Sequence, residues 1–294
     1  MFSKLPAGPL TILSRASILS IMNRLSTEER AKVISVLVEG NSLRATARIT
    51  GIARMTVEKL LRDLGAACQG FHDAKVRGLR SQRVQCDEIW SFVGAKDKNA
   101  TPDQKAQGWG DVWTWTAIDS DSKLMISWFV GNRSQRAANV FMQDVAARLA
   151  VRVQLSTDGL TRYVEAVDRS CGADVDFGTI AKTYAAPGAG GRYSPPSMVS
   201  AKRAIMTGNP DPRHISTSHV ERNNLSIRMN MRRFTRLTNG FSKKLEMHVL
   251  NLALHFTFYN WCKIHGSLRV TPAMEAGLSD HAWSVEELVD LLKP

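Results

Sequence analysis

The order in which apolar patterns change along the chain limits its fold more than any other feature. Up to about residue 64, apolar residues recur at helical spacing, and from Val84 onward the chain becomes apolar and β-prone. Residues 119–122 (DSDS) carry turn chemistry, and Ser134 can cap a helix. Strands are predicted at 84–93, 112–118, 123–130 and 151–155. The resulting order of strand, strand, strand, helix, strand favours an α/β domain with a mixed sheet.

Three helices are predicted before this sheet. The first begins at Ser26, which fits a capping box with Glu29, and the third follows a tight turn at Gly51. Three helices in about 40 residues, with a glycine turn before the last, are typical of a helix-turn-helix. An ordinary helical bundle without DNA contact has the same pattern. The predicted helices cover about 26–40, 42–49 and 54–64.

The third of these helices has a polar side available for contacts with DNA. Apolar residues such as Val57 and Leu60 are expected to pack inward. The side chains left free to meet phosphates or base edges are Arg54, Thr56, Lys59 and Arg62.

The predicted helices and strands divide the chain into five parts. Glycine and basic residues suggest a linker, and a Gly- and Pro-rich stretch at 172–216 is expected to be a long loop. The parts are an arm at 1–24, an all-α helix-turn-helix domain at 25–66, a linker at 67–82, the α/β domain at 83–265 and a tail at 266–294.

The charge of the chain favours a polyanionic partner, although some soluble proteins are simply basic. Net charge is +12 and the isoelectric point is about 9.8. No run of 18 apolar residues exists, so neither a membrane span nor a membrane partner is expected. No secretory signal is apparent, and none of the four cysteines forms a C-x-x-C pair. We therefore expect a cytoplasmic protein associated with the nucleoid, without a disulfide framework or a zinc ribbon.

Three acidic residues follow the order of an RNase H-like fold. In such a fold the first strand is central and the strand after the first helix lies beside it, so Asp87 and Asp158 are expected to come together, with Glu221 added from a later helix. Carboxylate oxygens are preferred ligands of Mg²⁺, and two such ions about 4 Å apart promote phosphodiester chemistry. Strand alternation is expected to turn Glu88 away from Asp87.

An arginine-rich stretch follows Glu221. Residues 222–236 contain five arginines and no acid, which suits a phosphate backbone, although a solvated basic face gives the same pattern. Its candidate DNA-binding residues are Arg222, Asn224, Arg228, Arg232, Arg233 and Arg236.

Four segments together resemble the insertion sequence one family of bacterial DDE transposases. They are CDEIWSFVG at 86–94, STDG at 156–159, HVERNNL at 219–225 and FSKKLE at 241–246. The resemblance implies that Asp87, Asp158 and Glu221 are the catalytic, metal-binding triad. The family often carries an N-terminal zinc finger, and no cysteine precedes Cys68 here.

The function implied by this resemblance is transposition. It implies a DNA transposase that uses Mg²⁺, with Mn²⁺ as a possible substitute, to cleave insertion-sequence ends and join them to target DNA. The partners implied are double-stranded DNA, both transposon ends and target, and a homodimer or higher oligomer on that DNA. Two alternatives stay open: a DNA-binding regulator with an inactive catalytic domain, and an RNase H-type nuclease without strand transfer.

Overall fold

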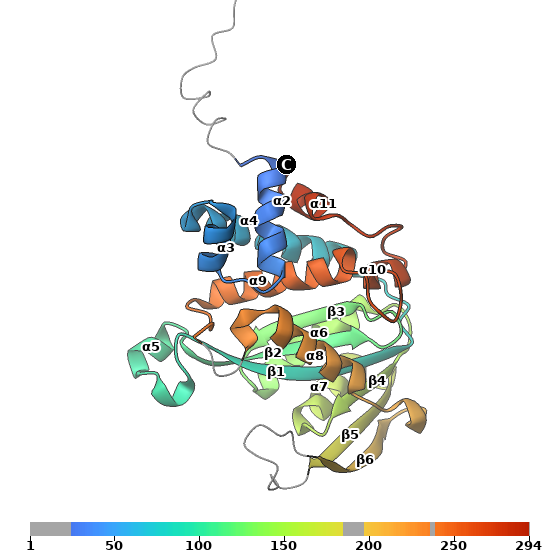
Figure 1. Ribbon diagram of the computed structural model, residues 1–294. Coiled ribbons are helices and arrows are strands. Elements are labelled where there is room, and N and C mark those ends of the chain that lie inside the picture. Colours follow the sequence, from blue (N-terminus) through green and yellow to red (C-terminus); the bar gives the residue numbers. More distant parts are fainter. Residues whose placement is uncertain (1–24, 185–196, 236–238, 294) are drawn as a thin grey trace, which may run out of the picture.

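A six-stranded mixed sheet lies at the centre of the protein (Figure 1). The computed structural model describes residues 25–184, 197–235 and 239–293. The strand order is β3-β2-β1-β4-β5-β6, and β1 pairs antiparallel with β2 and parallel with β4. The predicted mixed sheet with a central first strand is therefore confirmed. The strands are β1 (Arg83–Val93), β2 (Gly110–Asp119), β3 (Met125–Gly131), β4 (Gln154–Asp158), β5 (Asp176–Tyr184) and β6 (Met198–Thr207).

Two pairs of helices cover the two faces of this sheet (Figure 1). Helices α6 (Gln135–Arg148) and α7 (Thr161–Cys171) share a core with Cys86 of β1. Helices α8 (Ser218–Asn230) and α9 (Leu245–Thr257) share a second core with Ile89 of the same strand. Because side chains alternate along a strand, β1 supplies one core with its even-numbered residues and the other with its odd-numbered residues.

The three predicted N-terminal helices are confirmed. They are α2 (Thr27–Val38), α3 (Leu43–Thr50) and α4 (Arg54–Lys75). Ser26 and Glu29 form the expected capping box. Gly51 ends α3 with φ of 77°, a left-handed conformation that glycine adopts without strain.

The predicted linker at 67–82 is wrong over most of its length, because α4 continues to Lys75. Gly65 suggested a helix end, but it lies where α4 crosses α9: a Cβ on Gly65 would lie 2.6 Å from the carbonyl oxygen of Leu250. Buried residues of α2 and α4 share one core with residues of α9, including Leu254. The N-terminal helices are thus packed directly onto the sheet domain.

The predicted long loop at 172–216 is also wrong. It contains β5, which pairs parallel with β4, and β6, which pairs antiparallel with β5. Residues 185–196 lie outside the described part of the chain. Most side chains of β6 are exposed, so this edge strand lacks the apolar alternation that identifies a strand in sequence.

The remaining elements are short. The helix near the C-terminus is α11 (Val285–Val289), which contacts α2. The predicted arm at 1–24 lies outside the described residues. No helix in the described ranges is long and apolar enough to cross a membrane. The other elements are α5 (Pro102–Ala106), α10 (Pro272–Glu275), the π-helical turn η4 (Phe258–Cys262), and the 3-10 turns η1 (Asp97–Asn99), η2 (Pro212–His214), η3 (Arg232–Phe234) and η5 (Asp290–Leu292).

Candidate metal centre and nucleic-acid interface

Asp87 and Asp158 come together at the point where β4 ends. The parallel ladder between β1 and β4 finishes at the pair Cys86 and Thr157. Asp87 and Asp158 are the next residue on each strand. Beyond this point no β4 backbone lies beside β1, so the carboxylates have room to approach each other. The predicted pairing of these two acids is confirmed by their position.

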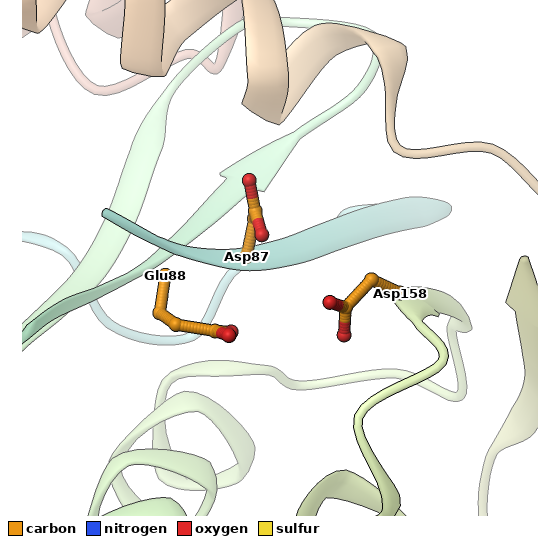
Figure 2. Close-up of side chains that lie close together, drawn as sticks. All are labelled: Asp87, Glu88 and Asp158. Carbon is orange, nitrogen blue, oxygen red and sulfur yellow. The ribbon is translucent and has the colours of Figure 1, made fainter. Parts of the chain in front are cut away.

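Glu88 joins the same group, which sequence reasoning did not anticipate. Carboxylate oxygens of Asp87, Glu88 and Asp158 lie within 4.8 Å of one another. Asp87 and Glu88 do leave β1 on opposite faces, as strand alternation requires. Figure 2 shows how they still meet: the longer Glu88 side chain turns toward Asp158 around the end of β4. The expectation that only one of the two faces the cluster is therefore wrong.

Asp87 lies against α8. Its carboxylate accepts a hydrogen bond of 2.8 Å from the Asn224 side-chain amide. Burial raises the pKa of Asp87 from 3.8 to about 7, and the charges of Glu88 and Asp158 act in the same direction. Ionising the Asp87 carboxyl therefore costs free energy, and a cation beside it would lower that free-energy cost.

Glu88 is held from the opposite face of the sheet. Arg133, just before α6, donates to it through Nε at 2.8 Å, and the hydroxyl of Tyr163 on α7 donates at 3.1 Å. Burial nevertheless raises the pKa of Glu88, with Asp158 adding to the effect. Arg133 also lies over the ring of Trp113, 4.6 Å from its centroid, which fixes the guanidinium.

Glu221 lies near this group but outside it. It is in the first turn of α8, one helical turn before Asn224, and its charge contributes to the raised pKa of Asp87. Its carboxylate accepts hydrogen bonds from Lys182 of β5 and, at 2.7 Å, from the hydroxyl of Thr217. Lys182 and Thr217 both donate to Oε1, so a metal ion bound through that oxygen would compete with Lys182.

The donor set fits a hard divalent cation. Three carboxylates on adjoining strands supply oxygen ligands of the kind that Mg²⁺ and Mn²⁺ prefer. The side-chain oxygen of Asn224 is buried and has no hydrogen-bond partner in the described part of the chain. A buried amide oxygen without a partner, one hydrogen bond away from Asp87, is a further oxygen available to such an ion.

The cations predicted on the third helix are largely paired within the protein. Arg54 lies 3.3 Å from Glu58, and Lys59 pairs with Asp63. Arg62 reaches Glu246 of α9 at 3.5 Å. Thr56 is exposed. These residues remain at the surface, but their positive charge is partly neutralised.

The arginine-rich stretch divides into exposed and internal residues. Arg222 and Arg232 are exposed, whereas Arg228 donates to the carbonyl oxygen of Phe234 at 3.0 Å. Arg236 lies outside the described residues. The helix α8 ends at Asn230, so Arg232 and Arg233 lie in the 3-10 turn η3 and not on α8.

Two residues predicted to bind DNA serve internal contacts instead. Asn224 is buried and binds Asp87. The Arg233 guanidinium donates to Asn251 at 2.6 Å and to Ser242 at 3.1 Å. Burial also lowers the pKa of Arg233 to about 10. We therefore assign Asn224 to positioning Asp87 and Arg233 to holding together the segment after α8.

Sequence reasoning missed two residues of the site besides Glu88. Lys182 fell in the stretch expected to be a loop, so nothing linked it to Glu221. Arg133 precedes α6 with no motif around it. Both are identified only by the strand register and helix packing that bring distant segments together.

Comparisons with known proteins leave the family open. The chain matches no protein-family model and no curated protein. A solved structure of a piggyBac transposase synaptic complex with hairpin DNA is similar, with 10% sequence identity and a TM-score of 0.42. The similarity covers 94% of this chain and 74% of that one. A likeness this distant does not assign the site, so the case for a function rests on the geometry of the residues themselves.

Proposed function

We propose that this protein is a metal-dependent DNA transposase, with Asp87, Asp158 and Glu221 as its catalytic carboxylates. The observation that carries the proposal is the approach of Asp87 and Asp158 at the end of β4, with Glu221 on the helix beside them. The resemblance of four sequence segments to the insertion sequence one transposases supports it. The net charge of +12 suits a nucleic-acid substrate.

The proposed reaction has two steps on DNA. In the first, a water oxygen bonds to the phosphorus at the end of the element, and the bond to the 3′-oxygen breaks to leave a free 3′-hydroxyl. In the second, that hydroxyl bonds to a target phosphorus and displaces a target 3′-oxygen. Divalent metal, when bound, activates the attacking oxygen and neutralises charge on the leaving oxygen.

The residues of the chain supply position and charge for these steps. Asp87 and Asp158 would hold the metal from adjoining strands. Glu88 lends further negative charge, and Arg133 keeps its side chain fixed. Asn224 fixes the carboxylate of Asp87 from the side of α8.

Two DNA duplexes must meet for joining, so we also propose that the protein acts as a homodimer or higher oligomer on DNA. Within each subunit, α4 would contact the ends of the element through its exposed face, as a helix-turn-helix does. The proposed place of action is the bacterial nucleoid.

The experiment uses DNA that carries the flanks of this coding sequence. The full chain is incubated with this DNA and Mg²⁺, and nicked and joined products are separated on a denaturing gel. We expect both products from the wild type and neither from Asp87→Asn, with binding to the DNA retained. Nicking without joining would indicate the nuclease instead, and binding without either product would indicate a regulator.

A further inference from the structure

A second charged site lies between the N-terminal helices and the chain that follows α8. It is a cleft of about 890 Å³, lined by the turn between α2 and α3, the first turn of α4, and residues from 230–233 and 239–247. A Cβ on Gly40 would lie only 2.8 Å from the carbonyl oxygen of Asn230. The turn after α2 thus contacts the end of α8 directly, and both parts of the protein build one cleft.

The cleft carries positive charge that the protein does not neutralise. The one carboxylate in its lining is Glu58, which already lies 3.3 Å from Arg54 and 3.7 Å from Arg62. In the described part of the chain, the other cations of the lining form no ion pair with an acid. The exposed cations that line the cleft are Arg44, Arg54, Arg232, Lys243 and Lys244.

The walls of the cleft are fixed by internal contacts. Arg233 is bonded to Asn251 of α9 and to Ser242, which ties the segment after α8 to the helix behind it. Lys243 is held over the ring of Phe241, 4.1 Å from its centroid. Several exposed cations around one cleft suit a ligand with repeated negative charges, which a nucleic-acid backbone provides.

We propose that this cleft binds the sugar-phosphate backbone of the DNA end, between the segment contacted by α4 and the bond cut at the carboxylates. This proposal rests on the proposed transposase function and adds a defined DNA path to it. In this proposal no flexible linker separates the N-terminal helices from the sheet domain. The N-terminal helices hold the DNA at a fixed position relative to the acidic group.

The length of α8 determines the distance between the cleft and the bond cut at the carboxylates. Nine residues separate Glu221 from Asn230, which corresponds to about 14 Å along a helix. For a duplex that runs along α8 with a rise of about 3.4 Å per base pair, the phosphates in the cleft would lie roughly four base pairs from the cut bond.

The test compares two double variants of the full chain. Arg44→Ala with Lys244→Ala removes two cleft cations, and Arg80→Ala with Arg136→Ala removes two exposed cations that do not line the cleft. Binding to duplex DNA carrying the element's end is measured between 50 and 200 mM salt. We expect the cleft variant to bind at least about tenfold more weakly and to lose about two units of salt slope, and the control variant to match the wild type.

A second measurement uses the same DNA with neutral methylphosphonates about four base pairs from the cut. This change should weaken binding by the wild type and the control but not by the cleft variant, which has already lost those contacts. A wild-type salt slope in the cleft variant, or equal weakening of all three proteins, would overturn the cleft proposal and leave cleavage at the carboxylates standing. Failure of the wild type to bind the ends at all would instead contradict the proposed function.

Discussion

The two charged regions of this protein lie at opposite ends of α8 and are built in opposite ways. The acidic group is partly buried, and strand register and hydrogen bonds from both faces of the sheet hold it. The cationic cleft is open and comes from turns and helix ends. The helix itself favours this arrangement, because Glu221 lies near its positive end and Arg232 follows its negative end. The proposed chemistry would thus take place at a rigid position, while the charge proposed to bind DNA is spread over a surface.

A variant of the acidic group should lose cleavage, and a variant of the cationic cleft should lose DNA binding. This separation is the largest effect that we expect. Asp158→Asn should reduce metal-dependent cleavage by at least about a thousandfold, as loss of a catalytic group does, while DNA affinity stays within about twofold. Arg44→Ala with Lys244→Ala, which removes two cations of the cleft, should weaken DNA binding and leave Mn²⁺ affinity unchanged. Cleavage assays, gel shifts and Mn²⁺ titrations on both variants check this. If both variants lost both properties, the two regions would not be independent.

Ionisation of Asp87 in the acidic group should lower the stability of the folded protein as the pH rises. The pKa of Asp87 is about 7 in the folded protein and 3.8 ordinarily. Well below pH 3.8 the carboxyl is protonated in both states. Between about pH 4 and pH 7 the unfolded chain ionises first, so the folded state loses stability, roughly 4 kcal/mol in all.

The variant Asp87→Asn removes this penalty. With a chelator present, urea unfolding should show little difference from the wild type near pH 4. Above pH 7 the variant should be the more stable protein. An advantage for the variant that stays constant across this range would show that Asp87 does not titrate with a raised pKa.

The packing of α4 against α9, which holds the N-terminal helices on the sheet domain, can be tested by substitutions in α4. Gly65→Ala should destabilise the protein by about 1–3 kcal/mol, since the new methyl group meets the backbone of Leu250 in α9. Gly70→Ala is the matched control on the same helix, where a Cβ meets nothing within 4 Å. It should stabilise by about 0.5–1 kcal/mol. Equal effects in thermal unfolding would mean that α4 does not pack closely on α9.

The smallest effect concerns the ion pair that Glu221 makes with Lys182. The ammonium group occupies an oxygen that a metal ion would use and repels that ion. Lys182→Met should therefore tighten Mn²⁺ binding, by about fivefold or roughly 1 kcal/mol at an effective dielectric near the surface value. Lys202→Met, an exposed lysine on the neighbouring strand β6, is the control and should change nothing. Weaker metal binding in Lys182→Met would show that Lys182 supports the site.

The sequence predicted the acidic side of the molecule better than the basic side. The order of the elements along the chain follows from apolar patterns. In an RNase H-like fold that order places the strand after the first helix beside the first strand, so the approach of Asp87 and Asp158 could be expected. The place of Glu88 could not, because it depends on β4 ending at Asp158. Lys182 was missed because β5 and β6 lie within a Gly- and Pro-rich stretch and β6 is an exposed edge strand.

The basic side depends on contacts that sequence patterns do not reveal. Arginine counts did not distinguish the exposed Arg232 from Arg233, which turns inward to Asn251. The end of α4 was placed too early, because Gly65 serves helix packing and does not end the helix. The exposed cleft cations Arg44 and Lys244 lie far apart in the sequence, Lys244 within the segment FSKKLE, and come to the same cleft only through the fold.

Titration of Mn²⁺ into the full chain, followed by calorimetry at pH 8, tests for the metal centre without any knowledge of the DNA ends. We expect saturable binding by the wild type and a loss of at least about tenfold in affinity, or roughly 1.4 kcal/mol, in both Asp87→Asn and Asp158→Asn. Binding that is absent from the wild type, or unchanged in both variants, would contradict a metal centre at the end of β4.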